Sequence, residues 1–243
     1  MNDRDPEHHW SELLDAAHRL LEDHDFVRAR SVLRDVMNYC DKTWGEDDVH
    51  LIRPLRMMAE SLWREHSPFE PHNEPELGCL QQALRIARRR LPPNHLEIGR
   101  LAGEVGTHLV GARRLDEGTS LMLECLEIAE MNGSEDFSPY LQTIAQVRME
   151  QSRPAEALPF IERAAAIQER RDPSSVIHAL ARFHLGRCLA ALGRHQDALD
   201  QLQLALHLFD AQRIHGSHAV SMNEIMEAID RVRDEMLRSP SDS

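Results

Sequence analysis

Small and large apolar residues alternate along this chain with the period of an α-helix. The clearest copies of the pattern are SRPAEALPFIERAAAIQE, which begins at Ser152, and GRHQDALDQLQLALHLFD, which begins at Gly193. In each copy a polar turn precedes a small residue, which is followed by a large apolar residue and then by another small one. These three positions lie on one face of a helix, so the stripe predicts a helix that packs closely against a neighbour.

The same stripe recurs five times, at intervals of ~40 residues, and predicts five helix pairs. The small residue that opens the second helix of each pair is replaced by Glu76 in the second copy. In the other copies the opening small residues are Ala29, Gly118, Ala157 and Ala198. The large residues are Leu33, Leu80, Met122, Ile161 and Leu202, and the closing residues are Val36, Ala83, Cys125, Ala164 and Ala205. Helix pairs repeated in this way stack into a solenoid, which presents an extended surface to a partner.

We therefore expect an all-α repeat domain over residues 7–237. Its repeats are predicted at approximately 7–41, 48–90, 94–131, 136–170 and 174–211, and an amphipathic helix over 217–237 is predicted to cap the last repeat. The polar side of this cap is expected to face solvent and comprises Glu224, Glu227, Asp230, Arg231 and Asp234. Residues 238–243 are predicted to form a disordered tail. The insertion Ser67–Asn73 is either a tolerated lengthening of a turn or a loop that carries specificity.

Composition and charge narrow the possible functions. Apolar residues make up 42% of the chain and aromatic residues only 5%, which favours helix packing over a β-rich core. The formal net charge of −13 argues against a general binder of nucleic acid or anionic membranes, because both attract a positive field. The first residues, MNDRDPEHHW, lack the features of a signal peptide, and no uncharged apolar run approaches the ~20 residues that span a bilayer. The sequence predicts a cytoplasmic protein.

Motifs of catalysis and cofactor binding are missing from the sequence. The cysteines Cys40, Cys79, Cys125 and Cys188 have no paired spacing, and buried thiols are favoured over disulfides or metal ligands. No histidine cluster joins a third ligand at a metal-binding spacing, and the glycines do not match a dinucleotide fingerprint. We predict no cofactor, no metal and no enzymatic activity. A catalytic site assembled across several repeats is the alternative that the sequence leaves open.

The segments between helix pairs carry a family resemblance. TWGEDDVHLI (Thr43–Ile52), RLPPNHLEIGRLAG (Arg90–Gly103) and IHGSHAVSMNEI (Ile214–Ile225) resemble the connectors of tetratricopeptide repeats of the kinesin-light-chain type. EALPFIERAAAI (Glu156–Ile167) resembles the second helix of such a repeat. The resemblance implies a right-handed superhelical solenoid of about five tetratricopeptide-like helix pairs plus a C-terminal capping helix. The asparagines that line the peptide groove of kinesin light chains are replaced here by Asp15, Met57, Glu104, Thr143 and His184, so cargo-adaptor activity is not implied.

The first helices of tetratricopeptide repeats line a concave groove, and the resemblance assigns groove positions in this chain. They are Arg53, Arg56, Trp63, Arg64, Arg100, Gln142, Gln146, Phe183 and Arg187. The arginines, with Trp63 and Phe183 as apolar anchors, favour a protein or peptide partner that carries acidic residues. The first hypothesis is therefore an adaptor or scaffold that binds a peptide segment in this groove. The alternatives are a regulatory sensor whose superhelix changes shape on binding a ligand or peptide, and a solvated mixed-charge face that binds nothing in particular.

Overall fold

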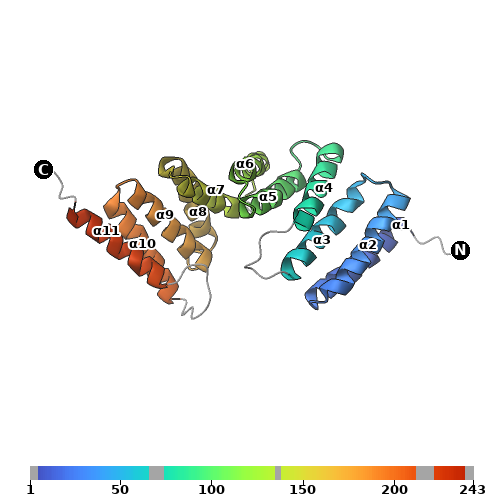
Figure 1. The fold of residues 1–243 in the computed structure, drawn as a ribbon, viewed down its shortest axis with the longest axis horizontal. Coiled ribbons are helices and arrows are strands. Elements are labelled where there is room, and N and C mark those ends of the chain that lie inside the picture. Colours follow the sequence, from blue (N-terminus) through green and yellow to red (C-terminus); the bar gives the residue numbers. More distant parts are fainter. Residues whose placement is uncertain (1–4, 66–73, 135–137, 212–221, 239–243) are drawn as a thin grey trace. The chain divides into compact units, whose positions relative to one another are not determined.

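The computed structural model describes residues 5–65, 74–134, 138–211 and 222–238, and within these ranges the chain forms helices and no strand (Figure 1). The predicted insertion at Ser67–Asn73 and the tail beyond Arg238 lie outside the described residues. The all-α fold class is confirmed. The helices are α1 (Pro6–Glu22), α2 (Phe26–Thr43), the short 3-10 helix η1 (Val49–Leu51), α3 (Ile52–Glu65), α4 (Glu74–Arg90), α5 (Leu96–Gly111), α6 (Leu115–Met131), α7 (Ser138–Glu150), α8 (Pro154–Arg171), α9 (Val176–Ala191), α10 (His195–Ala211) and α11 (Met222–Arg238).

The chain divides into two compact units. The first unit spans residues 1–134 and contains the pairs α1/α2, α3/α4 and α5/α6, and the second spans residues 135–243 and contains α7/α8, α9/α10 and α11. Within each unit, every helix packs against the helices that precede and follow it. The five predicted helix pairs and the additional C-terminal helix are therefore present.

The small–large–small stripe forms the contact inside each pair. Ala29, Ala157 and Ala198, which open second helices, are fully buried. The other predicted stripe positions Leu33, Ala83, Ala164, Leu202 and Ala205 are equally inaccessible to solvent. Small side chains at these places let the helix backbones approach each other, and the large residue fills the groove of the neighbouring helix.

The closest approach lies between α5 and α6, where two glycines face each other. A Cβ atom added at Gly106 would lie 2.8 Å from the carbonyl oxygen of Gly118, and one added at Gly118 would lie 2.7 Å from the carbonyl oxygen of Gly106. Both obstructing atoms are backbone, so they cannot move aside by a side-chain rotation. Glycine is therefore required at both positions by packing, since neither residue has a positive φ.

Glu76 breaks the stripe, and the structure shows what it contacts. Its side chain is 2% exposed, and its Oε2 atom lies 3.6 Å from Nδ1 of His108 on α5. A buried carboxylate is costly unless a positive charge or hydrogen bonds compensate it. The α4–α5 contact thus uses a polar pair at a position that is small and apolar in the other repeats.

We expect Gly106→Ala to lower the free energy of unfolding by about 1–3 kcal/mol, because the added methyl group collides with the α6 backbone. Gly78 provides a matched control, because it lies in α4 and a Cβ added there meets nothing within 4 Å. Gly78→Ala should raise the free energy of unfolding by about 0.5–1 kcal/mol through helix propensity. Urea unfolding monitored by circular dichroism measures both values, and equal effects of the two substitutions would refute the packing role of Gly106.

We expect His108→Leu to lower the free energy of unfolding by about 1–3 kcal/mol, because the buried carboxyl group of Glu76 loses the imidazole beside it. The double variant Glu76→Leu/His108→Leu should recover part of this loss. His18→Leu, at an exposed position on α1, serves as the control and should change stability by less than about 0.5 kcal/mol. A double-mutant cycle from chemical unfolding measures the coupling, and strictly additive losses would show that the two side chains act independently.

Candidate functional site

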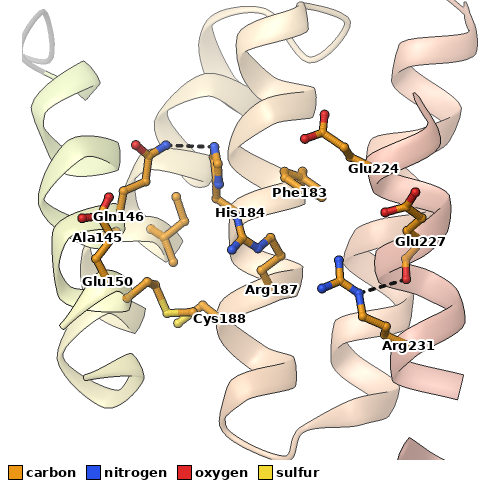
Figure 2. A pocket seen from close by; sticks show the side chains of 12 residues that line it. Ala145, Gln146, Glu150, Phe183, His184, Arg187, Cys188, Glu224, Glu227 and Arg231 are labelled. Carbon is orange, nitrogen blue, oxygen red and sulfur yellow. Dashed lines mark hydrogen bonds between the residues drawn. The ribbon is translucent and has the colours of Figure 1, made fainter. Parts of the chain in front are cut away.

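A pocket of about 590 Å³ lies among the helices of the second unit (Figure 2). Side chains of α7, α9 and α11 surround it, and α8 contributes one apolar residue. The lining residues are Ala145, Gln146, Met149, Glu150, Ile161, Phe183, His184, Arg187, Cys188, Glu224, Glu227 and Arg231. On α7, α9 and α11 the lining residues gather on one face, because positions three or four apart lie side by side on a helix.

The apolar part of the pocket is built from side chains that also belong to the core. Phe183 is 4% exposed and Ile161 is fully buried. The guanidinium carbon of Arg187 lies 5.7 Å from the centroid of the Phe183 ring, a cation–π arrangement. Phe183 was predicted to project into a groove as an apolar anchor. In the structure it is part of the pocket wall, because α9 directs its ring into the packed interior.

His184 and Gln146 are joined across the pocket by a hydrogen bond of 2.9 Å (Figure 2). The bond connects the amide nitrogen of Gln146 with Nε2 of His184, so the amide donates and the imidazole nitrogen accepts. Burial, followed by the nearby positive charge of Arg187, lowers the pKa of His184 to about 4. The imidazole is therefore neutral near pH 7, as its role as a hydrogen-bond acceptor requires.

The charged groups of the pocket are of both signs. Arg187 and Arg231 face it together with Glu150, Glu224 and Glu227 (Figure 2). Arg231 also donates a hydrogen bond of 3.2 Å from Nε to the backbone carbonyl of Glu227, one turn earlier on α11.

Three side chains of α11 take part in the pocket, which the sequence analysis did not predict. Glu224, Glu227 and Arg231 were predicted on the polar, solvent-facing side of a cap; they are exposed, and they also line the pocket. The apolar stripe of α11, which comprises Ile225, Ala228, Ile229 and Val232, is buried against the preceding helices, and this fixes the rotation of α11 about its axis. The residues beside that stripe consequently face α9. The repeat spacing could have indicated that these residues face α9, because α11 occupies the place of a first helix in a further pair.

The structure places the predicted groove residues in both units. Gln142, Gln146, Phe183 and Arg187 belong to the second unit, and the last three line the pocket. Arg53, Arg56, Trp63, Arg64 and Arg100 belong to the first unit. Gln142 is half-buried on α7 and is not among the residues that line the pocket.

In the first unit, the predicted excess of positive charge is largely compensated by carboxylates. Arg56 contacts Glu104 through a pair of hydrogen bonds, of 3.1 Å from Nε and 2.5 Å from Nη2, and contacts Glu97 at 3.2 Å. Arg100 lies 3.6 Å from Glu97. Glu104, at a position that the sequence analysis assigned to the groove, is thus the principal partner of Arg56.

Trp63 and Arg64 lie in the last turn of α3 and differ in exposure. Trp63 is 59% exposed, which is unusual for a tryptophan and leaves its ring accessible to a partner. Arg64 lies 3.3 Å from Glu60 and 5.6 Å from the centroid of the Phe26 ring. Trp63 is therefore the predicted anchor that the structure leaves available at the surface.

Within the described ranges, no group of three or more histidine, cysteine, aspartate or glutamate side chains is placed to hold a metal ion. Among the helices that the structure describes, none is long and apolar enough to cross a membrane. The four cysteines are free thiols, and Cys40, Cys125 and Cys188 are buried.

Comparison with known proteins supports the predicted family resemblance. The model of the tetratricopeptide repeat family matches residues 137–211, a range that contains α7–α10. No curated protein matches the chain. The predicted resemblance to tetratricopeptide repeats of the kinesin-light-chain type is confirmed for the fold by the solved structures that follow.

Several solved structures share this fold at low sequence identity. Nearly identical TPR-like repeats of a protein from Podospora anserina, assigned as a kinesin light chain, superpose with a TM-score of 0.68 at 16% identity, covering 87% of this chain and 99% of that one. BtubC (BKLC) from P. vanneervenii gives a TM-score of 0.67 at 16% identity, covering 90% and 97%. Aspartyl phosphate phosphatase F from Bacillus subtilis gives 0.64 at 14% identity, covering 95% of this chain and 60% of that one. The chain therefore has the fold of a tetratricopeptide repeat solenoid.

We expect the imidazole of His184 to titrate near pH 4, well below the usual value near 6.5. Because the unfolded chain then binds this proton before the folded protein does, His184 contributes a loss of stability as the pH falls from about 6.5 to about 4, and no loss above about pH 7. Nuclear magnetic resonance titration of the ring measures the pKa directly. Urea unfolding at several pH values should show a shallower loss for His184→Gln than for the wild type, and a ring pKa near 6.5 would contradict the assignment.

Proposed function

We propose that this protein is a non-enzymatic adaptor or scaffold that binds a peptide segment of another protein on the face formed by the first helices of its pairs. The tetratricopeptide repeat fold itself serves as a scaffold for protein–protein interactions. The observation that supports the finer proposal is the pocket of the second unit, where two first helices, α7 and α9, and the similarly placed α11 direct polar groups around an apolar wall. The proposal retains the cytoplasmic location that the sequence predicts.

The pocket has the features of a recognition site that is formed before its ligand arrives. Gln146 and His184 are held in position by their mutual hydrogen bond, and Arg187 is held over the ring of Phe183. Side chains that are already ordered lose little conformational entropy on binding, which favours affinity. Helices rather than loops supply the residues, so the backbone beneath them is also fixed.

The charges of the pocket suggest which peptides it selects. Arg187 and Arg231 suit an acidic side chain through charge-assisted hydrogen bonds. Glu224 and Glu227 stand on the same α11 wall and repel a second negative charge nearby. We therefore propose that the preferred segment carries one acidic residue beside an apolar residue, rather than a continuous acidic run. Phe183 and Met149 are proposed to contact the apolar residue.

The first unit offers a candidate contact surface of its own. Trp63 offers an exposed aromatic surface of the kind that dominates binding energy at many interfaces. Arg53 is also exposed on α3. Arg56 has a structural role in the proposal, because its hydrogen bonds to Glu97 and Glu104 connect α3 with α5.

Arginines on α11 provide a matched pair of variants that test the site. Arg231 lines the pocket, and Arg233 is exposed on the same helix beside Asp230 and outside the pocket. Peptides selected by display against the full chain should bind Arg231→Glu at least ~10-fold more weakly than the wild type, which corresponds to about 1.4 kcal/mol. Binding to Arg233→Glu should stay within about 2-fold of the wild type. Fluorescence anisotropy measures the affinities, and thermal melts should be similar for all three proteins.

The outcomes separate the pocket from other surfaces. Equal weakening by both substitutions would indicate a general effect of charge and would remove the pocket from the proposal. Unchanged binding to both variants would place the selected peptides elsewhere on the chain. A selected consensus dominated by runs of acidic residues would contradict the single-acid preference while leaving the pocket as the binding site.

A further inference from the structure

Part of the surface of α11 is left uncovered in the second unit. Among the helices that the structure describes, α10 and α9 contact α11, and Figure 1 shows it beside α10. This contact buries one stripe of the helix, and the face on one side of that stripe lines the pocket. The side chains on the other side of the stripe are exposed. We call this second side the outer flank; it carries Met226, Asp230, Arg233 and Leu237.

The four residues of the outer flank lie on one line along the helix. They are spaced by four, three and four residues, which is the spacing of the seam along which helices pack in a coiled coil. Met226 and Leu237, at the two ends of the line, are 49% and 81% exposed. The side chains of Asp230 and Arg233, between them, are 75% and 56% exposed. The outer flank is therefore a helix-packing seam against which no described helix lies.

The order of the residues in this seam is complementary to its own reverse. The midpoint lies between Asp230 and Arg233, and Met226 and Leu237 are equally far from it along the sequence. When two copies of α11 lie antiparallel about this midpoint, each apolar end faces an apolar end, and each acidic side chain faces a basic one. In parallel helices, Asp230 would face Asp230 and Arg233 would face Arg233, which is unfavourable. The pattern thus selects an antiparallel two-fold contact that uses the same surface of both copies.

We propose that the outer flank of α11 binds the outer flank of a second copy of this chain, forming an antiparallel dimer with two-fold symmetry. In this dimer Met226 of each copy packs against Leu237 of the other, which removes exposed apolar surface from water at both ends. Asp230 of each copy pairs with Arg233 of the other. The charged centre fixes the direction and the register of the two helices, as charged and polar residues do in coiled coils.

The ion pair that the seam already contains is compatible with the dimer. Within one chain Arg233 lies 3.6 Å from Asp230, and both side chains are exposed. Such a pair contributes little to stability. A guanidinium has five N–H donors, so Arg233 can keep this carboxylate and also bind that of the second copy. The dimer depends on the order of the charges and on the two apolar ends, and it requires no excess of either charge.

The edges of the seam limit the strength of the dimer. On the edge nearer the pocket, Glu227 and Asp234 are both negative, and the antiparallel arrangement brings Glu227 of one copy towards Asp234 of the other. The other edge is apolar and carries Met222 and Met236. A contact of one helix per copy is also at the small end of specific interfaces. We therefore expect a weak, reversible dimer that forms at protein concentrations of roughly 10–100 µM.

Sedimentation equilibrium of the full chain between ~5 and ~500 µM tests the proposal. The wild type should change reversibly from monomer to dimer. Asp230→Arg should weaken the dimer at least ~10-fold, because the arginines of both copies then meet at the centre. Asp230→Arg/Arg233→Asp restores the complementary order, so its dimer should match the wild type within about 3-fold. Asp35→Arg makes the same change at an exposed position on α2 and should alter dimerisation by no more than about 2-fold.

A mixture of two variants tests the antiparallel register. Asp230→Arg and Arg233→Asp should each dimerise weakly alone, whereas an equimolar mixture should form a heterodimer, because two arginines on one copy then face two aspartates on the other. Thermal melts of the variants should stay close to that of the wild type, because both positions are exposed. Peptides selected for the pocket should bind Asp230→Arg as they bind the wild type, so failure of the dimer and failure of the peptide site are recognised separately.

Several results would overturn the proposal. One is a wild-type chain that stays monomeric over the whole concentration range. Another is a dimer that Asp230→Arg leaves unchanged, or that Asp35→Arg weakens equally, because the contact would then lie elsewhere or reflect net charge alone. A third is a loss of the dimer in Asp230→Arg that neither the double substitution nor the mixture restores, because the charges would then not face each other across an antiparallel seam.

Discussion

The close approach of helix backbones within each pair is the constraint on which the rest of this fold depends. Aromatic residues are scarce, so stability rests on many small contacts between alanine, glycine and leucine faces rather than on a few large side chains. At Gly106 and Gly118 the approach leaves no space for a methyl group. This packing fixes the rotation of each helix, and the rotation in turn decides which side chains face a pocket and which face solvent.

The chain is acidic overall, yet its charges are not evenly mixed. On the first helices of the first unit, arginine and glutamate neutralise each other, as in the contact between Arg56 and Glu104. The pocket of the second unit holds both signs within one small volume. Between α4 and α6 of the first unit, exposed arginines line a pocket together with Asp116 and Glu117. Each of these surfaces therefore combines charges of both signs, in a different arrangement.

The sequence determined the fold more completely than the site, for physical reasons. Helix pairs follow from periodicity and small residues, which are local signals, so the all-α class, the five pairs and the terminal helix were predicted. The rotation of α11 depends on how its apolar stripe, which includes Ile225 and Ile229, packs against α10 and α9, so the pocket wall of Glu224, Glu227 and Arg231 was missed. The pairing of Arg56 with Glu97 and Glu104 joins residues more than 40 positions apart and has no signature in the local pattern. Glu76 was recognised as an exception, whereas its contact with His108 required the three-dimensional structure.

The environments of His184 and Cys188 determine whether these two side chains of the second-unit pocket carry a charge. Histidine and cysteine are the residues that most readily change charge near neutral pH, and His184 and Cys188 both line this pocket. Burial lowers the pKa of His184 to about 4 and raises the pKa of the Cys188 thiol above its ordinary value, so the imidazole stays neutral and the thiol stays protonated at physiological pH. A thiol that seldom ionises also reacts slowly with oxidants. Near neutral pH these two side chains therefore carry no charge, and the charges of the pocket come from its arginines and glutamates.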